Sequence, residues 1–309
     1  MTRLGSLLVL LAACLWGSNG LFVAALGAYG LESGQYTAVR VLAAFMGALV
    51  WQLVAERRVP RVSGAELAWL AVNGVVGVFL FSYTYGIAIQ LTSMATAAVL
   101  IYLMPSIVTA WSVVCGRERL TPLKVACLAL SLVACALVSG LATGGIVGSA
   151  AGIACGLVAA LCFSANNIVQ GGPLSGLTPR TVLVYTFGFA SVAAVAHVLV
   201  SGGAAQALAT YAAEPMALIV NVAYGLTCSL ATYFLYNTAL RMIPLGQAAT
   251  LATFEPVAAS VLGVALLGEE LTAAMLAGIG LEVVALVLLQ ASPKGARGPG
   301  HVAPPAGGD

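Results

Sequence analysis

The stretch TAAVLIYLMPSIVTAWSVVCGRERLT, residues 96–121, is matched 151 residues later by QAATLATFEPVAASVLGVALLGEELT, residues 247–272. Positions that are identical at this spacing include Tyr85, Ala88, Ala97, Ala98, Leu100, Pro105, Glu118, Leu120 and Thr121, which return as Tyr236, Ala239, Ala248, Ala249, Leu251, Pro256, Glu269, Leu271 and Thr272. Both copies carry a proline inside an apolar run and end on Leu-Thr. A duplication inside a largely apolar sequence predicts a membrane protein built from two related halves.

The composition indicates that the bilayer is the solvent of this chain. Of its 309 residues, 61% are hydrophobic and 7% are charged, and the mean hydropathy is +1.05, which excludes a water-soluble domain. A helix crosses the hydrocarbon core with roughly 20 apolar residues. Such runs lie at 4–26, 36–54, 67–89, 94–113, 122–140, 149–170, 181–200, 216–238, 246–267 and 273–290. The predicted fold class is an all-α polytopic membrane protein with ten transmembrane helices.

Five spans fall in each half, so residues 1–140 and 149–290 are predicted to form two five-helix repeats. Because five is odd, the second repeat enters the membrane in the opposite sense, which predicts an inverted 5+5 repeat. The first span is too long for a cleaved signal peptide, and it also matches the sixth span at an offset of 147 residues. Residues 291–309, rich in Pro and Gly, are expected to form a disordered cytoplasmic tail.

The positive charges predict the topology. With the N-terminus in the cytoplasm, eleven of the twelve Lys and Arg residues fall on the inner side, and the twelfth, Arg40, lies within the second span. The inner residues are Arg3, Arg57, Arg58, Arg61, Arg117, Arg119, Lys124, Arg180, Arg241, Lys294 and Arg297. The outer connections carry Glu32, Glu214, Glu269 and Glu270. A multi-pass protein of the inner or plasma membrane with both termini in the cytoplasm is therefore expected.

The loops that follow the two prolines repeat the same motif with opposite charge. Gly116-Arg117-Glu118-Arg119-Leu120-Thr121 is basic and predicted to lie inside, whereas Gly268-Glu269-Glu270-Leu271-Thr272 is acidic and predicted to lie outside. In both copies the threonine can cap the next helix, and Pro122 suits a first helical position. The favoured interpretation is a helix-start signal that does not contact substrate.

Glu255 is the sharpest candidate for a functional residue. It lies near the middle of the ninth span, where an ionised carboxylate costs on the order of 2.5–3.5 kcal/mol or more unless it is paired, hydrated or protonated. A proton carrier, or a counter-ion for a cationic substrate group, would suit this place. The alternative is a structural carboxyl group that is hydrogen-bonded to a neighbouring helix.

Pro105 and Pro256 are predicted to kink their helices. Each proline lacks an N–H group and displaces the carbonyl group four residues earlier, that of Ile101 or Ala252, which then needs another partner. Interrupted helices in matching places of two halves mark the binding sites of many inverted-repeat carriers. A kink that serves only packing is the alternative.

Arg40 and a set of polar and aromatic residues are further candidates. Arg40 is expected either to extend towards the outer headgroups or to offer a fork-shaped cation to a carboxylate or phosphate in a cavity. With Glu255 it would make a dipolar cavity suited to a zwitterion. The softer set comprises Trp16, Asn19, Tyr83, Tyr85, Tyr102, Asn166, Asn167, Tyr233, Tyr236 and Asn237. Interfacial belts or hydrogen bonds between helices are the alternative for each of them.

Together these features resemble the drug/metabolite transporter superfamily, in its ten-span EamA-like branch. They are Leu15-Trp16-Gly17-Ser18-Asn19, Arg40, Pro105 with 116–121, and Glu255-Pro256-Val257 with 267–272. The resemblance covers residues 4–290. It implies an inverted repeat, a central cavity lined by spans one to four and six to nine, peripheral fifth and tenth spans, and movement of small organic solutes, often export of amino acids. Phe187 stands where an equivalent of Arg40 is expected, and no substrate signature is present.

Glu282 lies at the centre of the tenth span, opposite Ser131 in the repeat. Because the resemblance implies that this span is peripheral, packing or a shared-proton hydrogen bond beside Gly278 and Ala285 is favoured over contact with substrate.

The expected function is secondary active transport of a small organic metabolite by alternating access. An uncoupled facilitator or channel-like pore, or a non-transporting sensor, is the alternative. The sequence has no H-E-x-x-H motif and no Walker loop, and its seven cysteines and two histidines have no metal-ligand spacing, so we expect neither an enzyme, a cofactor nor a bound metal. The expected partners are lipid, the solute and coupling protons, without nucleic acid. A monomer or homodimer is expected.

Overall fold

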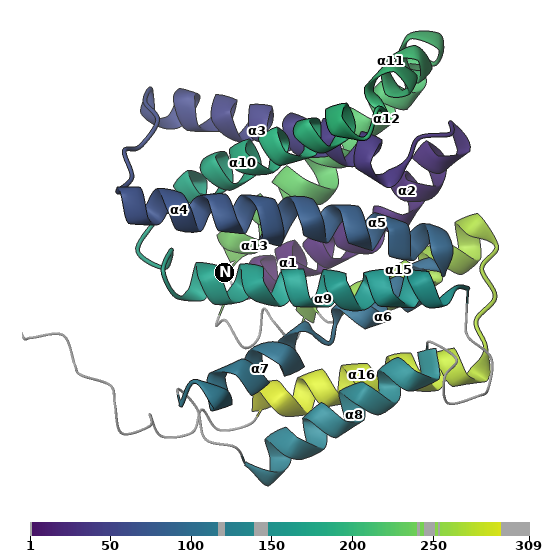
Figure 1. The fold of residues 1–309 in the computed structure, drawn as a ribbon. Coiled ribbons are helices and arrows are strands. Elements are labelled where there is room, and N and C mark those ends of the chain that lie inside the picture. Colours follow the sequence, from purple (N-terminus) through teal and green to yellow (C-terminus); the bar gives the residue numbers. More distant parts are fainter. Residues whose placement is uncertain are drawn as a thin grey trace, which may run out of the picture.

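The computed structural model describes residues 2–116, 121–138, 148–239, 242–243, 251–252 and 254–291. Within these ranges the secondary structure is entirely helical, as predicted (Figure 1). Residues 117–120 of the basic loop motif and residues 292–309 of the predicted tail lie outside the described ranges. α16 includes Ala291, the first residue of that predicted tail.

The helices of the first half are α1 (Thr2–Gly17), α2 (Asn19–Ala28), α3 (Ser33–Glu56), α4 (Gly64–Val72), π-helical η1 (Asn73–Leu80), α5 (Phe81–Leu91), α6 (Met94–Ile101), α7 (Met104–Val114) and α8 (Pro122–Val138). Those of the second half are α9 (Ala150–Gly171), α10 (Pro179–Val200), α11 (Ala204–Ala213), α12 (Pro215–Tyr224), π-helical η3 (Gly225–Ala231), α13 (Thr232–Ala239), α15 (Glu255–Leu267) and α16 (Ala273–Ala291).

Among the described residues, seven helical stretches are long and apolar enough to cross a bilayer. They are Arg3–Ala28, Ser33–Glu56, Gly64–Leu91, Met94–Val114, Ala150–Gly171, Pro179–Val200 and Pro215–Tyr236. Three shorter apolar helices, Pro122–Val138, Glu255–Leu267 and Ala273–Ala285, lie where the fifth, ninth and tenth spans are predicted. α11 falls in a stretch that was expected to be a simple outer connection. Its ten residues are too few to cross the membrane.

The distribution of side chains is that of a protein surrounded by lipid. Large apolar side chains such as Leu7, Val54 and Val200 are exposed on the outside, whereas Gln52 and Asn73 are buried between helices. Apolar surface of this extent would promote aggregation in water but suits hydrocarbon. Nδ2 of Asn73 donates to Oγ1 of Thr186 on another helix at 3.2 Å, and Nε2 of Gln52 donates to Oε2 of Glu56 in its own helix at 2.9 Å. The chain is therefore a multi-pass membrane protein.

The two halves are packed into one bundle (Figure 1). α3 lies along α10, and η1 packs against both α9 and α10. α8 and α16 pack against each other on the side of the bundle opposite α3 and α10. α1 lies between α13 and α15 in contact with both, so the first span is held by helices of the second half.

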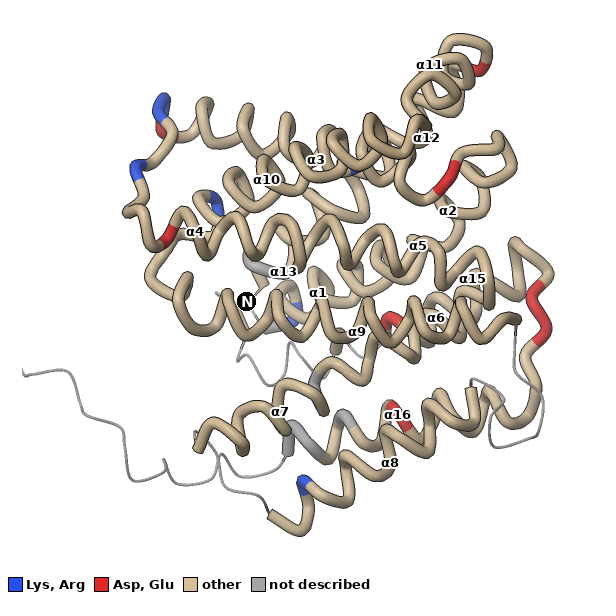
Figure 2. The backbone as a smooth tube through the Cα atoms, in the orientation of Figure 1, with Lys and Arg blue, Asp and Glu red and all other residues tan. Residues whose placement is uncertain are grey.

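Charged residues divide between the two ends of the bundle (Figure 2). Blue segments gather at the end where α4, α8 and α10 begin, and red segments mark the α2–α3, α11–α12 and α15–α16 connections at the other end. Glu56 and Glu66 are acidic residues at the basic end, where Glu56 forms an ion pair with Arg180 at 3.6 Å.

Candidate functional site

Two helix breaks of the chain each carry a proline. α6 ends at Ile101 and α7 begins at Met104, with Pro105 in its first turn. α15 begins at Glu255, with Pro256 in its first turn. Each proline therefore starts a new helix, where a missing N–H group is tolerated, instead of bending an unbroken one as the sequence led us to expect.

Tyr102 joins these two breaks. Pro256 has no N–H group to donate to the carbonyl oxygen of Ala252, and the Tyr102 hydroxyl lies 2.8 Å from that oxygen. The same hydroxyl is 3.0 Å from Oε2 of Glu255, whose side chain is 8% exposed. The Ala252 carbonyl oxygen, which cannot accept a hydrogen bond from Pro256, thus accepts one from a tyrosine of the other half.

Gly17 places the first span against the Glu255 break. α1 ends at Gly17 and α2 begins at Asn19, so the Leu-Trp-Gly-Ser-Asn stretch is itself a helix break. A Cβ atom on Gly17 would lie 2.8 Å from Cβ of Ala258 and 3.1 Å from the carbonyl oxygen of Glu255, distances that require a glycine. Asn19 is buried and donates from Nδ2 to the carbonyl oxygen of Trp16 at 2.6 Å.

Arg40 is buried between α3 and η3. Glycine at position 225 allows close approach, because an added Cβ there would collide with the Arg40 carbonyl group. Nε of Arg40 donates to Oγ of Ser229 at 3.0 Å, and Nη1 donates to the Tyr224 hydroxyl at 2.9 Å. The i→i+5 bonding of a π-helical turn brings two residues five apart together on one face. The guanidinium group is therefore directed into the protein, and Arg40 as a whole is 6% exposed.

Arg40 and Glu255 share one electrostatic environment, although they come from different halves. Tyr85 of α5, Cys228 of η3 and Tyr233 of α13 each interact with both charged groups. Among the described residues, no carboxylate lies within ion-pair distance of Arg40. The cation is therefore surrounded by neutral hydroxyl and aromatic groups.

Aromatic rings line the same region. The Trp16 ring centroid lies 6.1 Å from that of Tyr233 and 5.6 Å from that of Tyr236. Phe22 stacks on Tyr224 at 4.9 Å. Of the predicted candidates, the structure thus brings together Arg40, Glu255, Tyr102, Trp16, Asn19 and Tyr236.

Tyr83 and Asn166 lie elsewhere. Tyr83 packs against His197 at 4.7 Å between ring centroids, near the C-terminal end of α10. Asn166 of α9 is buried against η1 and donates from Nδ2 to the carbonyl oxygen of Gly77 at 3.4 Å. Both residues therefore form hydrogen bonds or packing contacts between helices. This is the alternative that was given above for the polar and aromatic candidates.

Sequence reasoning missed the partners of Arg40, which are Tyr224 and Ser229. A guanidinium group has five N–H donors, so a buried arginine requires acceptors at the same depth. Both residues lie inside the eighth predicted span and could have been proposed on that ground. Their selection over other hydroxyl groups depends on the contact between α3 and Gly225, which leaves no local pattern.

The loop motifs serve helix ends in the described residues. Thr121 and Thr272 accept from the backbone N–H groups of Lys124 and Met275 at 3.3 and 3.2 Å, which confirms the predicted caps. Oε1 of Glu269 accepts from the backbone N–H group of Met94 at 2.7 Å. A carboxylate at a helix N-terminus is favourable, so the acidic loop holds the start of α6.

Glu282 lies away from this site, between α16 and α8. It is 1% exposed, and its Oε1 accepts from Oγ of Ser131 at 3.2 Å, while Ser106 donates to Ser131 at 3.1 Å. A hydrogen bond between packed helices is the role that the sequence favoured for this residue.

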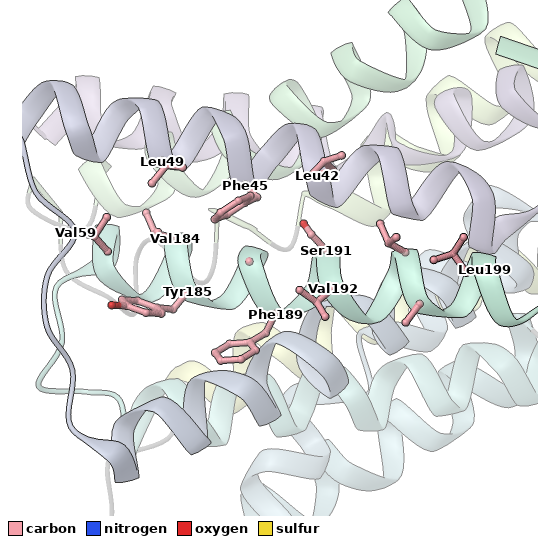
Figure 3. A pocket seen from close by; sticks show the side chains of 13 residues that line it. Leu42, Phe45, Leu49, Val59, Val184, Tyr185, Phe189, Ser191, Val192 and Leu199 are labelled. Atoms are coloured by element: carbon pink, nitrogen blue, oxygen red, sulfur yellow. The ribbon is translucent and has the colours of Figure 1, made fainter. Parts of the chain in front are cut away.

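A groove of about 740 Å³ runs along α3 and α10 on the outer surface (Figure 3). Leu42, Phe45 and Leu49 line it from α3, and Tyr185, Val192 and Leu199 line it from α10. Its lining is almost entirely apolar and contains none of the predicted site residues. This groove faces the surrounding lipid and is separate from the Arg40 and Glu255 region.

The sequence also matches known proteins. The model of the EamA-like transporter family matches residues 3–140 and again 150–290. Relatives include "Uncharacterized inner membrane transporter YicL" of Salmonella typhimurium, 28% identical over 88% of this chain and 90% of that protein. Another is an "Uncharacterized transporter" of Archaeoglobus fulgidus, 27% identical over 93% and 96% of the two chains. "Uncharacterized transporter YwfM" of Bacillus subtilis is 27% identical over 47% of each chain, about half its length.

A solved structure described as "Crystal structure of protein" superposes with a TM-score of 0.61 at 19% identity, covering 92% of this chain and 95% of the other. This likeness concerns the fold alone. The family match extends over both halves of the chain, and the full-length relatives bear the names of transporters. The chain belongs to the EamA-like transporter family, within the drug/metabolite transporter superfamily.

Proposed function

We propose that this protein is a secondary active transporter that moves a small carboxylate-bearing metabolite, such as an amino acid, out of the cytoplasm by alternating access. It would act in the inner or plasma membrane as a monomer or homodimer, with both termini in the cytoplasm and protons as the coupling ion. Spans from both halves would surround the region that contains Arg40 and Glu255.

The buried Arg40 carries this proposal. A guanidinium group in a low-dielectric site is stabilised by a charged partner, and the described residues supply only neutral acceptors. A solute carboxylate would supply the missing charge. Glu255, held in the same environment from the other half, would meet the ammonium group of a zwitterion or carry the coupling proton.

Paired contacts support an inverted repeat. A Cβ atom on Gly5 of α1 would lie 2.8 Å from Ile243, and one on Gly152 of α9 would lie 2.7 Å from Thr92. Gly152 follows Gly5 by 147 residues and Ile243 follows Thr92 by 151, the two offsets of the sequence repeat. The same glycine contact thus occurs twice with the halves exchanged, as a two-fold axis requires.

The ends of the bundle support ten spans with cytoplasmic termini. In the part of the chain that the structure describes, the basic connections lie at one end and the outermost acidic connections at the other (Figure 2). The three shorter apolar helices lie where the remaining three spans are predicted, which supports a count of ten. Positive charge marks the cytoplasmic side.

The test is transport in proteoliposomes with and without a pH gradient, using a panel of amino acids and their amides. We expect gradient-driven accumulation by the wild type and none by Glu255→Gln, because a carboxamide cannot exchange a proton. Glu282→Gln, which changes another buried carboxyl group away from Arg40, serves as the matched control and is expected to retain the response. Unchanged pH dependence in Glu255→Gln would remove Glu255 from the coupling mechanism.

The same assay separates the alternatives. An uncoupled facilitator would equilibrate a solute without accumulating it under any gradient. A sensor would bind a solute, measured by a ligand-dependent rise in melting temperature, yet move none of the panel.

A further inference from the structure

We propose that Tyr102 links the protonation state of Glu255 to the hydrogen bonding of the broken helix at Ala252, so that it acts as a positioning residue for coupling. This inference rests on the proposed function only for its consequence in transport. The geometry itself comes from three groups, the Tyr102 hydroxyl, the Ala252 carbonyl oxygen and the Glu255 carboxyl group.

A single hydrogen atom decides the arrangement. The Tyr102 oxygen lies 2.8 Å from the Ala252 carbonyl oxygen and 3.0 Å from Oε2 of Glu255. A phenol donates one hydrogen bond, so Tyr102 cannot donate to both acceptors at once. Pro256 makes the competition acute, because the residue four positions after Ala252 has no N–H group to donate to its carbonyl oxygen.

Protonated Glu255 satisfies all three groups. Its carboxyl O–H donates to the Tyr102 oxygen, and Tyr102 donates to Ala252. A chain of two hydrogen bonds then runs from the first turn of α15 through Tyr102, at the end of α6, and back to the segment before α15. This chain holds the helix break of one half against the helix break of the other.

Ionised Glu255 reverses the direction of one bond. A carboxylate only accepts, and it is a stronger acceptor than a peptide carbonyl group, so it takes the hydrogen of Tyr102. The Ala252 carbonyl group then loses its tyrosine donor at a partly buried position, which is unfavourable. Water or a movement of the break must replace the lost bond. Tyr102 keeps its proton in both states, and only Glu255 exchanges one with water.

Other ionisable groups near Glu255 do not change charge in the same pH range. Tyr102, Tyr85, Cys228 and Tyr233 interact with Glu255, and in water tyrosine and cysteine ionise above about pH 8.

Within the described ranges, the helices packed on α15 add no titrating group at the break, and Glu269 lies against Gly263 further along α15. α1 touches the break through Gly17, and its Arg3 and Cys14 are exposed. α2 has no ionisable side chain, and α6 has none before Tyr102. Among the described residues, Glu255 is therefore the carboxyl group at this contact.

The direct test is infrared difference spectroscopy of the full-length protein in lipid, titrated with pH in the absence of solute and gradient. We expect a carboxylic acid C=O band that Glu255→Gln removes. In Tyr102→Phe this band should remain but move to higher frequency, because the carboxyl group no longer donates to a phenol. An amide I change that accompanies titration in the wild type should be lost in both variants. Glu282→Gln should keep the Glu255 band and its amide change.

The proposal is overturned if the frequency of the Glu255 band is the same in Tyr102→Phe as in the wild type. It is also overturned if the wild type shows no Glu255 band. Should Tyr102→Phe fail to fold, wild-type protein with ring-deuterated tyrosine provides the second measurement. A tyrosine C–O band must then change at the same pH midpoint as the Glu255 band, and separate midpoints overturn the link.

Transport distinguishes the failure of this inference from that of the proposed function. Gradient-driven uptake by Tyr102→Phe should fall about tenfold, the equivalent of one hydrogen bond to a charged group, whereas exchange of labelled for unlabelled solute should stay near the wild-type rate. Equal losses in both modes contradict a coupling role. Absence of all transport by the wild type, together with the predicted spectra, would refute the transporter proposal and leave the hydrogen-bond link intact.

Discussion

At the scale of single residues, Arg40 and Glu255 form different hydrogen bonds that offset the free-energy cost of burying their side chains. Arg40 uses two neutral hydroxyl acceptors, Tyr224 and Ser229, and retains unused N–H donors. Glu255 shares one phenol with a backbone carbonyl group. Neither arrangement neutralises a full charge, so both groups are suited to a ligand or proton that does.

Arg40→Lys tests whether the guanidinium group holds a carboxylate. Lysine keeps the charge but loses the planar, two-pronged donor. We expect KM for a carboxylate solute to rise about tenfold or more, as for one lost charged hydrogen bond, and KM for its neutral amide analogue to stay unchanged. The measurement is uptake kinetics of the acid and the amide by both proteins. Equal effects on acid and amide would assign Arg40 to the packing of α3 on η3 alone.

At the scale of helices, glycine determines which elements meet. Gly225 of η3 admits the backbone of α3 at Arg40, and Gly74 of η1 admits the backbone of α10 at Thr186. The two glycines are 151 residues apart. Gly225 is the first residue of η3, and Gly74 is the second residue of η1. Close approach of this kind is typical of helices in membranes, where small residues replace the hydrophobic effect as the source of association.

Gly17→Ala tests the contact that holds α1 against the Glu255 break. The added Cβ would lie 2.9 Å from the backbone nitrogen of Ala259, which cannot rotate away. We expect a loss of roughly 1–3 kcal/mol in stability, as for other overpacked sites. Gly27→Ala in the same span is the matched control, because its nearest neighbour would be Nε2 of Gln90 at 3.5 Å.

Thermal melting of the two variants in one detergent provides the comparison. Gly27→Ala should match or slightly exceed the wild type, since alanine restricts the unfolded chain. Melting of Gly17→Ala at the wild-type temperature would show that the α1 break is not tightly packed against α15.

At the scale of the whole molecule, the charge distribution and the helix lengths support one orientation in the membrane. Seven longer and three shorter apolar helices lie between a basic end and an acidic end. α8 and α16 pack as a pair on one side of the bundle, joined by the bond between Ser131 and Glu282. These two residues are repeat counterparts, 151 positions apart.

Cysteine labelling in intact cells tests the proposed orientation. In a background without the seven native cysteines, Glu32→Cys and Glu214→Cys should react with a membrane-impermeant maleimide from outside. Arg58→Cys and Gly176→Cys, exposed at the opposite end, should react only after permeabilisation. The reverse pattern would invert the orientation, and labelling of all four from outside would contradict the ten-span count.

The sequence by itself determined the membrane environment, the duplication and the approximate positions of the apolar helices, because hydropathy and repeat spacing are local or additive properties. It also showed that Pro256 leaves the Ala252 carbonyl group without a donor, which follows from covalent structure alone. It could not show that the prolines start new helices, since no rule of propensity separates a break from a kink.

Only the tertiary structure decided which groups form hydrogen bonds with the Ala252 carbonyl group and with Arg40. Tyr102 reaches Ala252 across 150 positions of sequence, and Arg40 reaches Tyr224 across 184. Such pairs depend on how closely whole helices approach, and that approach is set by glycine contacts such as those of Gly17 and Gly225. Apolar residues occur on all faces of a membrane-spanning helix, so the sequence does not show which face is buried. Packing between the halves selects the buried face that carries the site.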